Sequence, residues 1–261
     1  MDWLITVPLG FVLGFLIGLT GVGGGALVAP SLYVILGLNY QDSIALSLIY
    51  SLFTKIVGGI QHIRQGTVLW KITLLYGLTG IPGSILGSHA IYRMGSATER
   101  VFPYVMAAVL VTVAVLILLE TVVRNLAAHD KPFSPYVFTS GGIAALAVFQ
   151  LFVGLLLGVT SVGSGSLVIL SMLYLFRMTA QQIVGSNIII ALIMVIPAGL
   201  THFGLGGVSW TVLGLLMLGS LVGTVLGAKT ALGLPQWALK LIIVVLILAG
   251  AVGTVLKAGA R

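Results

Sequence analysis

The sequence predicts an all-α polytopic membrane protein, and three observations carry this prediction. The 261 residues are 59% hydrophobic and only 7% charged, with a mean hydropathy of +1.22, which leaves too few polar side chains to solvate a soluble surface. Apolar runs close to the roughly 20 residues that cross a bilayer recur along the whole chain. The loops between them span only a few residues, so we expect no soluble domain.

The expected helical segments form two similar series. The first series covers residues 3–19, 26–36, 42–63, 69–92 and 99–119. The second covers residues 136–160, 166–176, 180–202, 209–232 and 235–256. A polar linker at 123–135 divides a first membrane repeat at 1–122 from a second at 136–261.

A shift of 140 residues aligns the two series without a gap. The stretch "GLTGVGGGALVAPS" (18–31) falls on "GVTSVGSGSLVILS" (158–171), and His62, Trp70 and Gly87 fall on identical residues further along. This self-similarity predicts a duplicated unit.

An odd number of crossings in each copy would invert the second copy relative to the first. The sequence allows roughly eight to ten membrane segments. If the short segments at 26–36 and 166–176 are counted as crossings, most loop Lys and Arg lie on one face of the membrane. We therefore expect two pseudo-symmetric, inverted five-segment repeats, with eight conventional spans as the alternative.

The two glycine-rich stretches are expected to break their helices. An unpaired backbone group in hydrocarbon costs several kcal/mol, so non-helical backbone survives only inside protein or beside a wet cavity. Each break precedes a short helix, whose first N–H groups are unpaired and carry partial positive charge, as in an anion site. Matching breaks in two repeats point to a transporter's binding site. The substrate-binding candidates in the breaks are Thr20, Gly21, Gly23, Gly24, Gly25, Thr160, Ser161, Gly163, Ser164, Gly165 and Ser166.

Further candidates lie on the helices that follow the breaks. Lys55 falls near the middle of 42–63, where a cation needs water, a partner, a substrate or a snorkelling conformation. Ser47 and Asn187 occupy aligned positions and complete the set of substrate-binding candidates. The candidates for gating or proton handling are His62, His202, Gln41 and Gln181, and for both histidines a helix-capping role is the alternative.

Other glycines are spaced four residues apart and predict close helix packing. They occur in "GFVLGFLIG" (10–18), "GSILG" (83–87) and "GSLVGTVLG" (219–227). The same ridges could also pair two copies of the chain into a homodimer.

The charged residues favour an anionic or neutral solute. All five acids fall at segment ends or in loops, which argues against a buried carboxylate relay or a carboxylate cage for a cation. The net charge of +7 fits both orientation in the bilayer and attraction of an anion. We expect no metal, no cofactor and no nucleic-acid partner, since the chain has no cysteine and no basic tract interleaved with aromatic residues.

The paired breaks, each followed by "H-x-x-x-G-x-V" (62–68 and 202–208), resemble the TauE/SafE family of sulfite exporters over essentially the whole chain. The resemblance implies a permease of the inner or plasma membrane for sulfur-containing anions such as sulfite or organosulfonates. A secondary transporter working by alternating access is the favoured function, with an anion channel of the same fold as the alternative. An intramembrane enzyme using Ser164 and His202 is disfavoured because the first repeat has Gly24 at the serine position.

Overall fold

The computed structural model describes residues 3–20, 24–95, 97–127, 139–163, 165–176, 178–205, 208–231 and 236–260, and within these ranges all regular structure is helical. The first half forms α1 (Trp3–Thr20), α2 (Gly25–Val34), α3 (Tyr40–Arg64), α4 (Trp70–Arg93) and α5 (Ala97–Ala127). The second half forms α6 (Ser140–Thr160), α7 (Ser166–Leu175), α8 (Ala180–Leu205), α9 (Trp210–Ala231) and α10 (Gln236–Gly259). The predicted all-α fold is confirmed.

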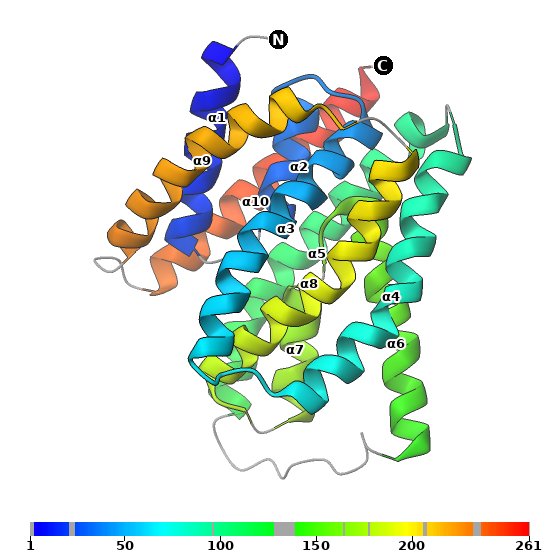
Figure 1. Cartoon of the computed structure of the whole chain (residues 1–261), viewed down its shortest axis with the longest axis vertical. Helices are drawn as coiled ribbons and strands as arrows, with labels where there is room; N and C mark the ends of the chain where they lie inside the picture. Colours follow the sequence, from blue (N-terminus) through cyan, green and yellow to red (C-terminus); the bar gives the residue numbers. More distant parts are fainter. Residues whose placement is uncertain are drawn as a thin grey trace.

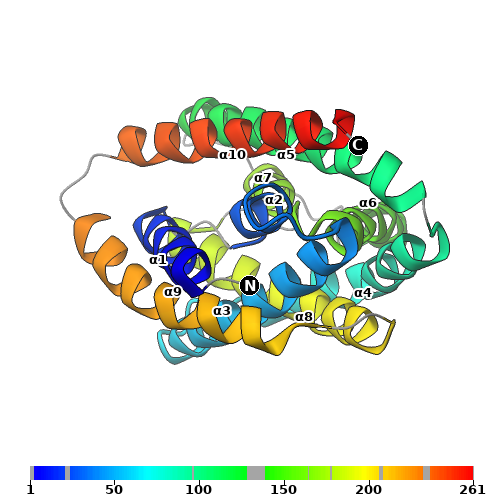
Figure 2. The same ribbon diagram turned by 90° about the horizontal axis from the view of Figure 1, so that it is seen from above.

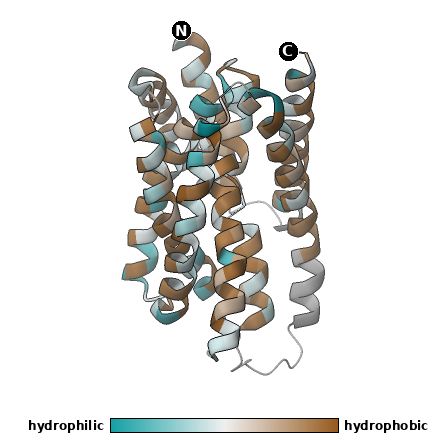
Figure 3. Ribbon diagram, turned by 90° about the vertical axis from the view of Figure 1, so that its right-hand side faces the viewer, coloured by the Kyte–Doolittle hydropathy of each residue, from teal (hydrophilic) through white to brown (hydrophobic). Residues whose placement is uncertain are grey.

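Six of the described helices are long and apolar enough to cross a membrane, namely α3, α5, α6, α8, α9 and α10. Their exposed side chains are largely leucine, valine and isoleucine. The colour of hydrophobic residues predominates along the ribbons in Figure 3. An apolar exterior of this kind suits contact with lipid tails.

The two short helices lie at the centre of the bundle (Figure 2). In Figure 1, α1 enters from the end where the N-terminus lies and α2 returns toward that end, while α6 and α7 make the same turn from the opposite end. A helix of 10 residues is about 15 Å long, half the thickness of the hydrocarbon. The N-terminal ends of α2 and α7 therefore lie deep inside the molecule.

The outer helices pack in pairs that join the two halves of the chain. The most extensive contacts are those of α1 with α9 and of α4 with α6, and α5 packs on α10 as α3 does on α8. Counterparts run in opposite directions, α3 against α8 and α5 against α10, as two inverted copies would (Figure 1).

The predicted glycine packing is confirmed in both of the tightest pairs. A Cβ on Gly14 of α1 would lie 2.3 Å from the carbonyl oxygen of Ser220 in α9. A Cβ on Gly83 of α4 would lie 2.0 Å from the carbonyl oxygen of Leu151 in α6. Because the backbones touch, only glycine fits at these positions.

The halves differ in how tightly they hold their short helices. Eight residues of α2 are buried, whereas α7 buries only Val168 and Met172. Helix α4 also packs extensively on α8, while α9, its counterpart in sequence, barely touches α3. The structure is thus asymmetric about its centre, with the α2 side more closely packed than the α7 side.

The largest difference from the expected helix boundaries among the described residues is at the end of α5. Helix α5 continues to Ala127, beyond its predicted end at residue 119 and into the predicted linker. The extension "TVVRNLA" contains neither glycine nor proline, so nothing in it stops a helix after the apolar run ends. The rest of that linker lies outside the described residues.

Candidate functional site

A cavity of about 420 Å³ lies where the two breaks meet, and residues of α1, α2, α3, α5, α7, α8 and α10 line it together with the turn after α6. Residues 25, 26, 161–163, 165 and 166 come from the breaks themselves. The polar side chains in the lining belong to Thr54, Lys55, Ser161, Ser166, Asn187 and Lys240.

The breaks are in direct contact through Gly25 and Ser161. A Cβ on Gly25 would lie 1.9 Å from the carbonyl oxygen of Ser161, so no other residue fits there. Ser161 ends α6 with a left-handed φ of 60°, which directs the chain back toward α7. Its hydroxyl lies 3.0 Å from the hydroxyl of Ser47, which anchors the turn to α3.

Both short helices present uncapped N-terminal ends to the cavity. The N-cap residues are Gly24 in α2 and Gly165 in α7, and neither has a side chain that could satisfy the first N–H groups. Intrahelical bonds to the Gly24 carbonyl begin only at Leu27 and Val28. Among the described residues the earlier N–H groups have no backbone partner, and the helix dipole adds partial positive charge at each end. Two such ends on one cavity favour an anion.

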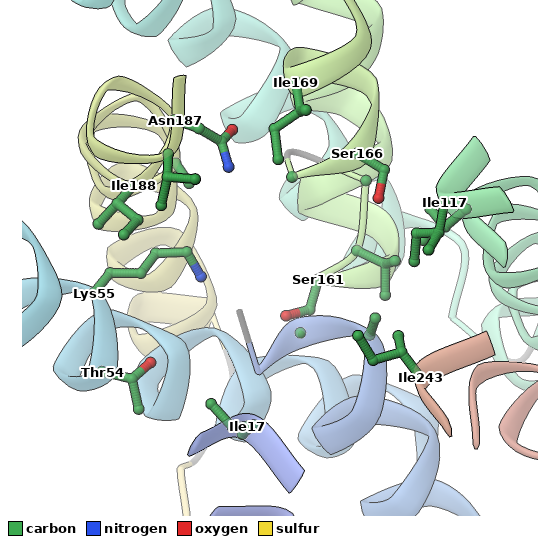
Figure 4. A pocket seen from close by; sticks show the side chains of 18 of the residues that line it. Ile17, Thr54, Lys55, Ile117, Ser161, Ser166, Ile169, Asn187, Ile188 and Ile243 are labelled. Atoms are coloured by element: carbon green, nitrogen blue, oxygen red, sulfur yellow. The ribbon is translucent and has the colours of Figure 1, made fainter. Parts of the chain in front are cut away.

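Side chains from α3 and α8 add further donors (Figure 4). The ammonium group of Lys55 points into the cavity and donates a hydrogen bond to the hydroxyl of Ser51. The amide of Asn187, from α8, reaches the cavity on the same side as Lys55. Its Oδ1 is buried and has no hydrogen-bond partner among the described residues.

Lys240 is a cavity residue that sequence reasoning missed. It lies in the second turn of α10, and with Lys55 it gives the lining two cations. One signal could have identified it: the 140-residue shift places Lys240 on Arg100, so both repeats carry a basic residue early in their last helix.

The acids whose side chains are described lie elsewhere, at the N-terminal end of α3. The Asp42 carboxylate accepts one hydrogen bond from the side-chain amide of Asn39, and Glu99 accepts one from the backbone N–H of Tyr40. No carboxylate lines the cavity within the described ranges, so its charged groups are all positive.

Three other sequence-predicted polar residues lie outside the cavity lining, and one of them supports it. Thr160 accepts a hydrogen bond from the N–H of Val162 at 3.1 Å and donates one to the carbonyl of Leu156 at 2.7 Å, which stabilises the turn. Gln41 donates to the Ile91 carbonyl at 3.2 Å, outside the cavity, and Gln181 is exposed at the start of α8.

Both predicted histidines also lie outside the cavity lining. Nδ1 of His62 lies 2.9 Å from the hydroxyl of Thr67, just beyond the end of α3. His202 is buried in α8, with Nε2 3.1 Å from the Gly158 carbonyl and Nδ1 3.1 Å from the Tyr92 hydroxyl. His202 thereby joins α8 to α6 and α4. Three candidates, Gly21, Gly23 and Ser164, lie outside the described residues, as does the side chain of Thr20.

The C-terminal end of α2 is held by a polar cluster. Lys257 of α10 donates hydrogen bonds to the carbonyls of Tyr33 and Leu38, and its ammonium lies 4.0 Å from the centre of the Tyr33 ring. The ring of Tyr33 packs edge-on against Tyr40, which stacks on Phe102 of α5. We call Lys257, Tyr33 and Leu38 the α2 latch. The aligned position of Lys257 in α5 is Ile117, so α7 has no equivalent lysine.

Comparison with known proteins agrees with this architecture. Residues 6–254 match the family described as "Sulfite exporter TauE/SafE". The chain belongs to the TauE/SafE family. "Probable membrane transporter protein YjnA" of Bacillus subtilis (strain 168) is 32% identical to this TauE/SafE chain over 85% of it and 87% of that protein. From the same organism, "Probable membrane transporter protein YunE" is 26% identical over 87% and 88% of the two chains, and "Probable membrane transporter protein YdhB" is 24% identical over 88% and 91%.

No solved structure matches the chain. Membership of the TauE/SafE family, together with the six long apolar helices, identifies an integral membrane transporter of the cell membrane.

Proposed function

We propose that this TauE/SafE transporter carries small sulfur-containing anions, such as sulfite or organosulfonates, by alternating access at the two breaks. The single observation that carries the proposal is the convergence of two helix N-termini, one from each half, on a cavity that Lys55 enters and no described carboxylate lines.

The donors around the cavity suit a sulfur oxyanion. A sulfite or sulfonate group presents acceptor oxygens in several directions. The cavity offers backbone N–H groups, the hydroxyls of Ser161 and Ser166, and the side chains of Asn187 and Lys55. Such fixed dipoles can replace the hydration shell of an anion inside the membrane.

The size and apolar part of the cavity suit a short organic tail as well. At about 30 Å³ for each water molecule, 420 Å³ holds about fourteen waters, more than a bare sulfite needs. Ile17, Ile117, Ile188 and Ile243 supply apolar lining for a carbon chain of one or two atoms.

The asymmetry of the short helices supports alternating access. The α2 side is closely packed and fastened by the α2 latch, whereas α7 buries few residues. A transporter of two inverted halves would exchange these two arrangements between its states. In this proposal the substrate passes unchanged, which fits the engagement of both ring nitrogens of His202 by Tyr92 and Gly158.

Reconstitution into liposomes tests the proposal. We expect labelled sulfite, thiosulfate or an organosulfonate to enter in a saturable manner, faster when unlabelled substrate is present inside. Repeating the assay with and without a proton gradient identifies the driving ion. Flux that neither saturates nor responds to internal substrate would indicate a channel, and absence of flux for every sulfur anion would refute the substrate class.

A further inference from the structure

The cavity lies between two layers of helices whose side chains differ in chemistry. Helices α3 and α8 pack together on one side of the short helices, and α5 and α10 pack together on the other (Figure 2). The first layer contributes Lys55 and Asn187 to the lining, whereas α5 contributes only Val113 and Ile117. Ile243 extends this aliphatic surface from α10, and Figure 4 shows Ile117 and Ile243 across the cavity from Lys55 and Asn187. We call Val113, Ile117 and Ile243 the aliphatic wall.

The aliphatic wall is held in place by the packing of α5 on α10. Val113 and Ile117 lie one turn apart on α5, about 6 Å along its axis, so they face the same way. They are 3% and 5% exposed, and Ile243 is 4% exposed, because most of each side chain is packed in the core. A methylene group placed against this wall leaves water without losing a hydrogen bond, which changes an affinity by about fourfold.

The anionic end of a guest is attracted to the opposite side of the cavity. Lys55 and the amide of Asn187 point into the cavity there, and the N-terminal ends of α2 and α7 lie at the breaks. Their partial positive charges hold an anionic group in the same region. A tail that leaves this group on the side away from Lys55 and Asn187 meets the aliphatic wall.

A positively charged tail would be unfavourable in this position. The described lining contains no carboxylate that could pair with an ammonium group, and Lys55 repels one in the same poorly solvated space. Lys240 also lines the cavity, but it has an interaction of its own within the protein and is not needed for this effect. An uncharged aliphatic tail avoids the repulsion and gains from burial against the wall.

We propose that the aliphatic wall is a subsite for the tail of an alkanesulfonate, with Ile117 limiting the length of the tail and the cavity disfavouring an ammonium group there. This inference rests on the proposed function, because it concerns the same site. It adds an orientation for the guest, a requirement for an uncharged tail and a specificity-determining role for Ile117.

Propanesulfonate and aminoethanesulfonate are matched probes of the tail. They have nearly the same shape, but one ends in a methyl group and the other in an ammonium group that is charged at about pH 7. We expect purified protein in detergent to bind propanesulfonate at least about tenfold more tightly in calorimetric titrations.

Variants at Ile117 test the length limit. Ile117→Ala opens space in the wall, so we expect the affinity for butanesulfonate relative to propanesulfonate to rise by at least about threefold. Leu118→Ala is the matched control, because Leu118 is the next residue on α5 but is 51% exposed and absent from the lining, so it should leave that ratio unchanged. Ile117→Val removes a single methylene and should shift the ratio in the same direction by a smaller amount. It supplies the reading if gel filtration and circular dichroism show that Ile117→Ala is not folded.

The possible results separate this inference from the proposed function. Equal affinities for propanesulfonate and aminoethanesulfonate, or equal length ratios in the Ile117 variants and Leu118→Ala, would overturn the tail subsite. If sulfur anions still cross proteoliposomes in a saturable manner in that case, the proposed function stands alone. Absence of both sulfonate binding and flux of every sulfur anion would overturn both.

Discussion

The carbonyl oxygen of Ser161 lies against Gly25, so that a β-carbon at position 25 would be 1.9 Å from it. Through this contact the break of one half sets the position of the other. We expect Gly25→Ala to force the breaks apart and lower the initial rate of anion uptake by at least about tenfold, with overpacking of about 1–3 kcal/mol. Uptake into proteoliposomes at matched protein content measures the effect. Gly214→Ala is the control, since nothing lies within 4 Å of a Cβ there, and equal rates for the two variants would contradict the prediction.

The contact between α1 and α9 predicts a loss of stability. A Cβ on Gly14 would lie 2.3 Å from the Ser220 carbonyl oxygen, so Gly14→Val cannot be accommodated without separating the helices. We expect a cost of about 1–3 kcal/mol, visible as a lower midpoint of thermal unfolding in detergent. Gly214→Val changes an exposed glycine of α9 and should leave the midpoint nearly unchanged. A midpoint for Gly14→Val equal to that of Gly214→Val would argue against backbone contact.

Replacing Asn187 with aspartate adds a negative charge with almost no change in the shape of the side chain. Asn187→Asp would place a carboxylate among donors that surround an anion, so we expect its apparent KM for anion uptake to rise by at least about tenfold. Gln181→Glu is the control, because it makes the same change of amide to carboxylate at an exposed position on the same helix, outside the cavity lining. That variant should transport normally. Similar KM values for both variants would remove Asn187 from the site.

The α2 latch predicts how the closely packed side opens. Lys257→Met removes both hydrogen bonds from the end of α2, to Tyr33 and Leu38, and should loosen that helix. The chain contains no cysteine, so Ala29→Cys introduces a single thiol at a position that is fully buried in α2. We expect a water-soluble maleimide to label this thiol several-fold faster in the Lys257→Met background. Lys257→Arg should keep labelling slow, and unchanged labelling in Lys257→Met would show that the latch does not hold α2.

The two histidines at aligned positions should differ in their effect on stability. His202 is buried and joins three helices through Gly158 and Tyr92, whereas His62 is half-buried and bonds Thr67 beside its own helix. Removing a buried hydrogen-bonded group costs about 1–3 kcal/mol. We therefore expect His202→Ala to lower the thermal midpoint more than His62→Ala. The reverse order would mean that His202 is not the structural link described above.

Much of the helical order follows from the sequence because hydrophobic length and helix breakers act locally. Apolar runs and their flanking polar residues placed the helix ends within a few residues, and "TGVGGG" and "TSVGSG" marked the positions where α1 and α6 stop. The end of α5 was missed because a helix continues past the hydrocarbon wherever nothing breaks it.

The site itself was only partly predictable because it depends on which helices become neighbours. Gly25, Ser161 and Ser166, which the breaks predict to bind substrate, line the cavity, because unpaired backbone in a membrane protein must lie inside protein or beside a wet cavity. Lys240 was missed because its distance from the breaks along the sequence gives no sign that α10 packs beside α2. Thr160 was predicted to bind substrate, but its hydroxyl forms hydrogen bonds within its own turn instead.

The pairing of α1 with α9 and of α6 with α4 bears on how such a chain could arise. Each pair takes one helix from either half, and its glycines leave a face that only a close neighbour can cover. Under the duplication that the sequence predicts, a half-length ancestor would have met this need by inserting into the membrane in both orientations and assembling with an inverted copy of itself. Gene fusion would then have fixed the two orientations in one polypeptide and freed each copy to diverge, which is how one half could acquire Lys55 and the other the lysine that fastens α2.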